Sequence, residues 1–100
     1  MFRHMVLMKF RPEVTSAMIE DVFKALADLQ GTIPGLLSFS GGVYSSSEGL
    51  NQGFTHGFSM DFNSLQERDA YFPHPDHEFV KGIIVPLLAD GGILTFDYEF

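Results

Sequence analysis

The chain has 100 residues, a formal net charge of -7 and no cysteine. That length suffices for one domain with one core, so we expect a single domain over residues 1–100. The acidic balance argues against nucleic acid or an anionic membrane as a partner, and the missing cysteine excludes disulfides, thiolate nucleophiles and cysteine-based metal sites.

Two observations bear on location. The N-terminal residues alternate between charged and apolar types and do not form the basic start and unbroken apolar run of a signal peptide. The longest apolar stretch, residues 83–89, is too short to span a bilayer and contains Pro86. We therefore expect a cytoplasmic protein with no membrane partner.

The first half of the chain has two strand patterns around one helix pattern. Residues 2–10 alternate between two faces, which predicts a strand, and one of these faces carries Phe2, His4, Val6, Met8 and Phe10. Thr15 fits the N-cap of a helix that runs to about Gln30. Residues 36–43 predict a second strand, which the glycines at 41–42 weaken by favouring a bulge or bend.

A long polar loop separates this strand from the next one. Residues 44–52 form the loop, and residues 53–62 alternate again, which predicts a third strand. Ser64 and Glu67 have the spacing of a capping box, so a short helix should follow and end at Phe72.

The last third of the chain predicts one more helix and one more strand. The helix should run from Pro75 toward Asp90, with Pro86 kinking or ending its last turn. Its buried side should consist of Phe79, Val80, Ile83, Ile84, Leu87 and Leu88. The glycines at 91–92 should then release the chain into a final strand at 93–100.

These elements give the βαββαβ order of a ferredoxin-like α+β sandwich with a four-stranded antiparallel sheet. Its helices cover one face of the sheet and leave the other to be hidden in another way. Eleven phenylalanines are more than one small core readily hides, and the final strand places apolar side chains at Leu94, Phe96, Tyr98 and Phe100. We therefore expect a homodimer through the sheet faces, with two sheets closing a barrel.

The chain is organised around a corner with two prolines. Pro73 should end the preceding helix, and Pro75 suits the first position of the next one. His74 is then the expected N-cap, and His77 lies in the first turn, where the helix dipole favours its neutral, basic form. Tyr71 lies just across the break and could share a pocket with it. The simpler interpretation is a helix–helix corner whose histidine only caps or hydrogen-bonds.

Two more histidines, His4 and His56, lie on strand faces otherwise made of Phe, Val and Met. Each alone is most simply a core residue with a satisfied hydrogen bond. Together with His77 they favour a polar spot in an apolar cleft, which is the usual form of a small-molecule site. Such a site could abstract a proton next to a carbonyl, with His77 as base and Tyr71 orienting it or stabilising the enolate.

Four runs of residues, in order and over essentially the whole chain, resemble the stress-responsive α/β-barrel (Dabb) domain family. They are RHMVLMKF at 3–10, IPG at 33–35, GFTHG at 53–57 and YFPHPDH at 71–77. The resemblance implies a ferredoxin-like fold that dimerises through its sheets into an α/β barrel. It does not fix an activity, because many members have none assigned and some are linked to stress tolerance.

One plant branch that this chain resembles consists of cofactor-independent polyketide cyclases that work by aldol condensation. The resemblance implies that His77 and Tyr71 act at the reacting centre and that His4 and His56 line the pocket. A further tyrosine of that branch falls at about Leu26 here, so the pocket has lost a polar group.

Three hypotheses follow, and whether the chain is an enzyme stays open. The first is a stress-related homodimer with a cavity for a small apolar or aromatic ligand and no established reaction. The second is a cofactor-independent polyketide cyclase or aldol-type enzyme. The third is a metal site built from His74 and His77 with His4 or His56, although no carboxylate or cysteine pattern supports it. We expect no metal and no cofactor, and we count His74 and Leu26 among the pocket residues.

Overall fold

The computed structural model describes all residues, 1–100. The chain forms β1 (Phe2–Phe10), α1 (Ser16–Asp28), β2 (Leu36–Val43), β3 (His56–Phe62), α2 (Leu65–Tyr71), α3 (Pro75–Ile84) and β4 (Leu88–Glu99). Single 3₁₀ turns at Leu29–Gly31 and Val85–Leu87 follow α1 and α3. The predicted βαββαβ order is confirmed, with α2 and α3 together forming the second helical segment.

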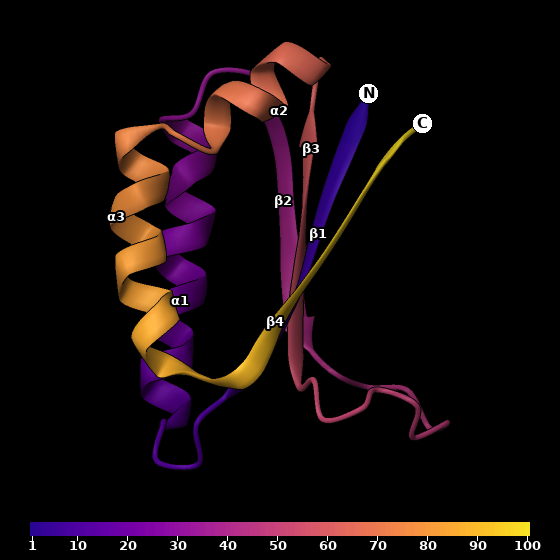
Figure 1. The fold of residues 1–100 in the computed structure, drawn as a ribbon. Coiled ribbons are helices and arrows are strands. Elements are labelled where there is room, and N and C mark those ends of the chain that lie inside the picture. The colour runs from indigo at the N-terminus through magenta and orange to yellow at the C-terminus, as the bar shows by residue number, and fades with distance from the viewer.

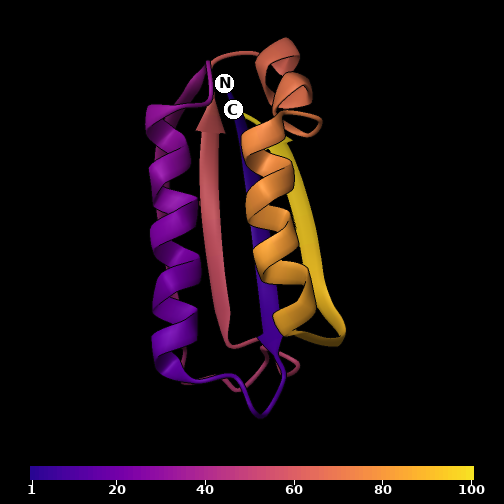
Figure 2. The same ribbon diagram turned by 90° about the vertical axis from the view of Figure 1, so that its left-hand side faces the viewer.

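The four strands form one antiparallel sheet in the order β2-β3-β1-β4. Helices α1 and α3 lie side by side over one face of this sheet, and α2 lies at one end (Figure 1 and Figure 2). The opposite face carries no helix, and the loop between β2 and β3 projects beyond it (Figure 1). This is the ferredoxin-like arrangement, with one sheet face covered and one left free.

The core fills the space between the helices and the covered face of the sheet. Alternate residues of each strand point into it, as the strand period requires. The buried apolar cluster consists of Val6, Met8, Val22, Leu26, Leu29, Ile33, Leu36, Phe58, Met60, Phe62, Tyr71, Val80, Ile84 and Leu88. Figure 2 shows how α1 and α3 cover these strands.

The free face of the sheet carries an exposed row of large, mostly apolar side chains along β4 and the residue that follows it: Leu94, Phe96, Tyr98 and Phe100. Beside this row, Arg3 of β1 pairs with Asp61 of β3 through two hydrogen bonds of 2.7 and 2.8 Å and also donates to the Tyr98 hydroxyl. The guanidinium holds the pKa of the Asp61 carboxyl below its usual value.

The predicted helix caps are present. Thr15 Oγ1 accepts from the Met18 N–H, Ser64 Oγ accepts from the Glu67 N–H, and His74 Nδ1 accepts from an N–H at the start of α3. Only half of the predicted capping box forms, since Glu67 Oε2 is buried without a hydrogen-bond partner.

Two predictions about the C-terminal third were wrong. The last strand begins at Leu88 and not at residue 93, because Pro86 ends the helical segment early and the chain enters the sheet through its two glycines. Phe79, predicted on the buried side of α3, is 72% exposed. The helix turns Val80 and Ile84 to the sheet, and their neighbour Phe79 points away.

Gly92 is expected to tolerate no side chain. A Cβ atom there would lie 2.5 Å from the Lys9 carbonyl oxygen and 2.6 Å from the Ala89 carbonyl oxygen, both of which are backbone atoms. We predict that Gly92→Ala lowers the free energy of unfolding by about 2 kcal/mol or more, because the backbone of β4 must shift. Urea unfolding at one fixed protein concentration measures this.

Gly82→Ala is the matched control. Gly82 lies inside α3, and a Cβ atom there would meet nothing within 4 Å. Alanine is the better helix former by about 1 kcal/mol, so this variant should be as stable as the parent or more stable. Equal effects of the two substitutions would contradict the close approach at Gly92.

Candidate functional site

One apolar cavity of about 230 Å³ lies between the sheet and α3. Of the residues singled out in the sequence, His4, Tyr71, His77 and Leu26 border it. The remaining lining is mostly apolar and consists of Val6, Met8, Phe58, Phe72, Val80, Lys81, Ile84, Val85, Ile93 and Thr95. A few polar groups in an apolar hollow are the usual composition of a small-molecule site.

The proline corner places Tyr71 and His77 against each other. Tyr71 is the last residue of α2, and α3 begins at Pro75 with His74 as its N-cap. The ring centroids of Tyr71 and His77 lie 4.2 Å apart. The sequence separates the two side chains by six positions, and the reversal between α2 and α3 brings them to the same cavity.

His77 is held in a neutral, oriented state. Its Nδ1 lies 2.8 Å from the Phe72 carbonyl oxygen, which can only accept, so Nδ1 carries the proton and Nε2 has the free lone pair. Burial lowers the pKa of His77 below its ordinary value of 6.5, although the bond to Phe72 opposes this in part. The imidazole is therefore an available base at neutral pH.

Tyr71 supplies a hydroxyl beside this base. Its side chain is buried, with only 1% of its surface exposed, and burial raises the pKa of its hydroxyl above the ordinary value. None of the hydrogen bonds within the chain uses this hydroxyl. Tyr71 thus stays protonated and can donate to an oxygen atom of a bound molecule.

His4 is fixed by a polar network that the sequence interpretation missed. Its Nδ1 lies 2.7 Å from Asp97 Oδ1, and Asp97 Oδ2 accepts from Arg68 at 2.7 Å. Arg68 also donates to Asp69. Burial alone would lower the pKa of Arg68, but its bonds to Asp69 and Asp97 raise it. The network orients the His4 ring at the cavity wall.

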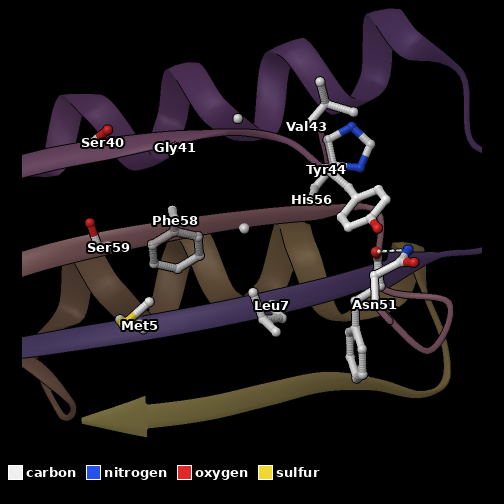
Figure 3. A pocket seen from close by; sticks show the side chains of 13 residues that line it. Met5, Leu7, Ser40, Gly41, Val43, Tyr44, Asn51, His56, Phe58 and Ser59 are labelled. Atoms are coloured by element: carbon white, nitrogen blue, oxygen red, sulfur yellow. Dashed lines mark hydrogen bonds between the residues drawn. The ribbon is translucent and has the colours of Figure 1, made fainter. Parts of the chain in front are cut away.

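His56 does not border this cavity, contrary to the prediction that four residues would line one hollow. It pairs across the sheet with Met8, whereas His4 pairs with Met60, so the two imidazoles lie at different levels of the sheet. The ring of His56 lies 5.3 Å from Phe10 and 6.0 Å from Phe23, measured between centroids, and burial lowers its pKa. It borders a separate groove at the β2–β3 end of the sheet (Figure 3).

His74 also lies outside the cavity. Its Nδ1 is used for capping, and the residue borders another hollow together with Ile33, Pro34, Gln66, Glu67, Ala70 and Tyr71. The corner geometry explains this, because capping turns the His74 ring back toward its own helix. No group of three His, Asp or Glu side chains comes together in a way that could hold a metal ion, so the metal hypothesis finds no ligand set.

The elements and their order define a ferredoxin-like α+β domain with a Tyr–His pair in an apolar cavity beneath α3. Residues 2–100 match the model of the Stress responsive A/B Barrel Domain, and the chain belongs to this family. No helix here has the combined length and apolarity needed to cross a bilayer.

Three known proteins are similar to this chain. Stress-response A/B barrel domain-containing protein HS1 of Arabidopsis thaliana is 32% identical over 97 residues, covering 97% of this chain and 87% of its own. Olivetolic acid cyclase of Cannabis sativa is 29% identical over 75 residues, covering 75% and 74%. A crystal structure of a dimeric ferredoxin-like protein from Jannaschia sp. CCS1 superposes with a TM-score of 0.89 at 28% identity, covering 99% and 98%.

Proposed function

We propose that this domain binds a small apolar carbonyl compound in the cavity beneath α3 and transfers a proton at the carbon next to the carbonyl, without a cofactor. His77 Nε2 would take the proton from that carbon, and the electron pair of the broken C–H bond would move toward the carbonyl oxygen. The Tyr71 hydroxyl would donate a hydrogen bond to this oxygen as negative charge develops on it.

The observation that carries the proposal is the state of the His77 ring. Its Nδ1–H is engaged by the Phe72 carbonyl, and its pKa lies below the ordinary value, so the lone pair on Nε2 is available. A structural histidine at a helix corner needs only the bond to the carbonyl. The adjoining Tyr71 ring, 4.2 Å away, and the apolar lining of the cavity are what proton abstraction from carbon requires in addition.

The similarity to olivetolic acid cyclase supports this class of chemistry and does not define the substrate. Leu26 is buried in the cavity wall, so the wall has no hydroxyl at this position. The polar side chains that border the cavity are His4, Tyr71, His77, Lys81 and Thr95. The absence of a hydroxyl at Leu26 favours a simple carbonyl compound over a chain with many oxygen atoms. A binding domain without turnover is the second candidate, and the same loss of polarity at Leu26 favours it.

We also propose that the domain works as a homodimer through the free face of the sheet. This face has two complementary halves. Over β4 lies the row of exposed side chains that includes Phe96, and over β2 and β3 lies a groove of about 370 Å³ (Figure 3). The lining of the groove includes the small residues Ser40, Gly42, Gly57 and Ser59, so it offers room for large side chains.

A two-fold axis through the middle of the sheet would place the β4 row of one protomer over the groove of its partner. The contact between the β4 row and the groove would then occur twice, once for each protomer, as a closed two-fold dimer requires. The apolar row is what such an interface would bury, and its removal from water would supply the driving force. The dimeric state named for the Jannaschia relative agrees with this proposal.

Tyr71→Phe is expected to slow proton exchange without weakening the fold. The probe is β-tetralone, a neutral bicyclic ketone with an acidic C–H next to its carbonyl, incubated in D₂O and followed by proton NMR. The parent protein should catalyse loss of the C–H signal. Removing a hydrogen-bond donor to the developing enolate should reduce this rate roughly 100-fold.

The fold control for this variant is its unfolding midpoint. The lost hydroxyl has no partner in the folded chain, so Tyr71→Phe should unfold at the same urea concentration as the parent or a higher one. Absence of any protein-catalysed exchange in the parent would refute the proton-transfer function and leave the binding candidate. An unchanged rate in the variant would remove Tyr71 from the mechanism.

A further inference from the structure

We propose that the ligand of this cavity carries a carboxylate, bound by Lys81 at the cavity mouth, in addition to the carbonyl that faces Tyr71 and His77. This inference rests on the proposed function and deepens it by naming the substrate class, an apolar oxo-acid. It goes beyond the Tyr–His pair because a neutral ketone would satisfy that pair equally well.

Lys81 has the right position on α3. It follows His77 by four residues, so the two side chains leave the same face of the helix one turn apart, with Cβ atoms about 5–6 Å from each other. Lys81 borders the cavity together with His77, and the residue is exposed, so it lies where the cavity meets the solvent. The long stem of a lysine can lie along the apolar lining while its ammonium group stays in contact with water.

The charge of Lys81 is not neutralised by the protein. The chain has 13 acidic and only 6 basic side chains, yet no carboxylate borders the cavity and none lies within 4.0 Å of the Lys81 ammonium. Arg3 and Arg68, by contrast, each bind an aspartate at 2.7 Å. In so acidic a protein, an unpaired cation at the mouth of an apolar cavity is a selective contact for an anion.

The surroundings of Lys81 fit one carboxylate better than a phosphate. The mouth offers a single ammonium and no arginine, and the N-terminus of α3 lies at Pro75, more than one turn away. Val85 and Ile93 border the same mouth and are about half exposed, so the body of the ligand next to its charge must be apolar. The spacing of His77 and Lys81 then places the carboxylate a few bonds from the reacting carbon.

The test compares two probes that differ only in charge, β-benzoylpropionate and its neutral amide. Each contains a ketone and an aromatic ring, and binding is measured by NMR titration at pH 7.5 to the parent, Lys81→Met and Lys24→Met. The parent should bind the carboxylate about five- to tenfold more tightly than the amide, as expected for one charge-assisted contact. Lys81→Met keeps the apolar stem and should reduce this ratio to about 1.

Lys24→Met is the matched control, since Lys24 is an exposed lysine of α1 that is absent from the cavity lining and also lacks an ion pair. It should keep the full preference for the carboxylate. Equal binding of the two probes by the parent, or a preference that survives in Lys81→Met, would overturn the inference. If the parent still exchanges β-tetralone, the proposed function stands without it. If neither probe binds and β-tetralone is not exchanged, both fail.

Discussion

Replacing His77 by glutamine is expected to abolish proton exchange from β-tetralone while the domain stays folded. Glutamine can still donate an N–H to the Phe72 carbonyl, but it has no nitrogen that accepts a proton at neutral pH. A positioned general base contributes roughly 10²- to 10⁴-fold, so the rate in the variant should fall to the background in D₂O. Proton NMR of the ketone measures this directly.

The pH dependence of the parent provides an independent check on the same residue. Burial lowers the pKa of His77 below 6.5, so the imidazole keeps its lone pair as the pH falls through 6.5 and loses it only at lower pH. The acid limb of the exchange rate should therefore lie below pH 6.5. A limb above this value, or an exchange rate in His77→Gln that equals the parent's, would exclude His77 as the base.

Phe96→Ala is expected to raise the dissociation constant of the dimer roughly a thousandfold. Phe96 is 67% exposed on the free sheet face, and burial of a phenylalanine side chain contributes about 2 kcal/mol. A two-fold interface contains this residue twice, so the substitution removes about 4 kcal/mol from association. Sedimentation equilibrium over a range of protein concentrations measures the change.

Phe79→Ala makes the same chemical change on the other side of the molecule. Phe79 lies on α3 and is 72% exposed, so the two positions match in residue type and exposure. This variant should dimerise like the parent. A dimer that Phe79→Ala dissociates and Phe96→Ala does not would move the interface to the helices. A parent chain that stays monomeric at micromolar concentration would refute the dimer altogether.

Much of the fold follows from local patterns in the sequence. The alternation in residues 2–10 and the helical spacing after Thr15 each describe elements whose cause lies within a few residues. The same holds for the corner, where the rings of Pro73 and Pro75 fix their own φ angles and restrict the residue before each of them. The start of β4 was missed because paired glycines usually interrupt a strand, whereas here Gly92 is required by a backbone contact with β1.

The site was only partly predictable, because its remaining parts depend on contacts between distant residues. Asp97 meets His4 across 93 positions of the chain, and Arg68 reaches Asp97 from α2. One signal was present in the sequence, since Asp97 is an acidic residue between the apolar Phe96 and Tyr98 and therefore faces the opposite side of the strand. The position of His56 along the sheet, relative to His4, depends on how β3 and β1 are paired. The alternation of residue types does not specify this register.

Consecutive residues of β4 point to opposite faces of the sheet. Phe96 and Tyr98 point to the free face, while Asp97 between them bonds His4 at the cavity. If the proposed dimer forms through this face, a twist of β4 that moves one set of side chains would also move the other, and ligand binding and subunit association would be thermodynamically coupled. Such coupling is reciprocal: the factor by which a ligand tightens the dimer equals the factor by which dimerisation tightens the ligand. The abundance of the chain in the cell would then determine how strongly it retains its ligand.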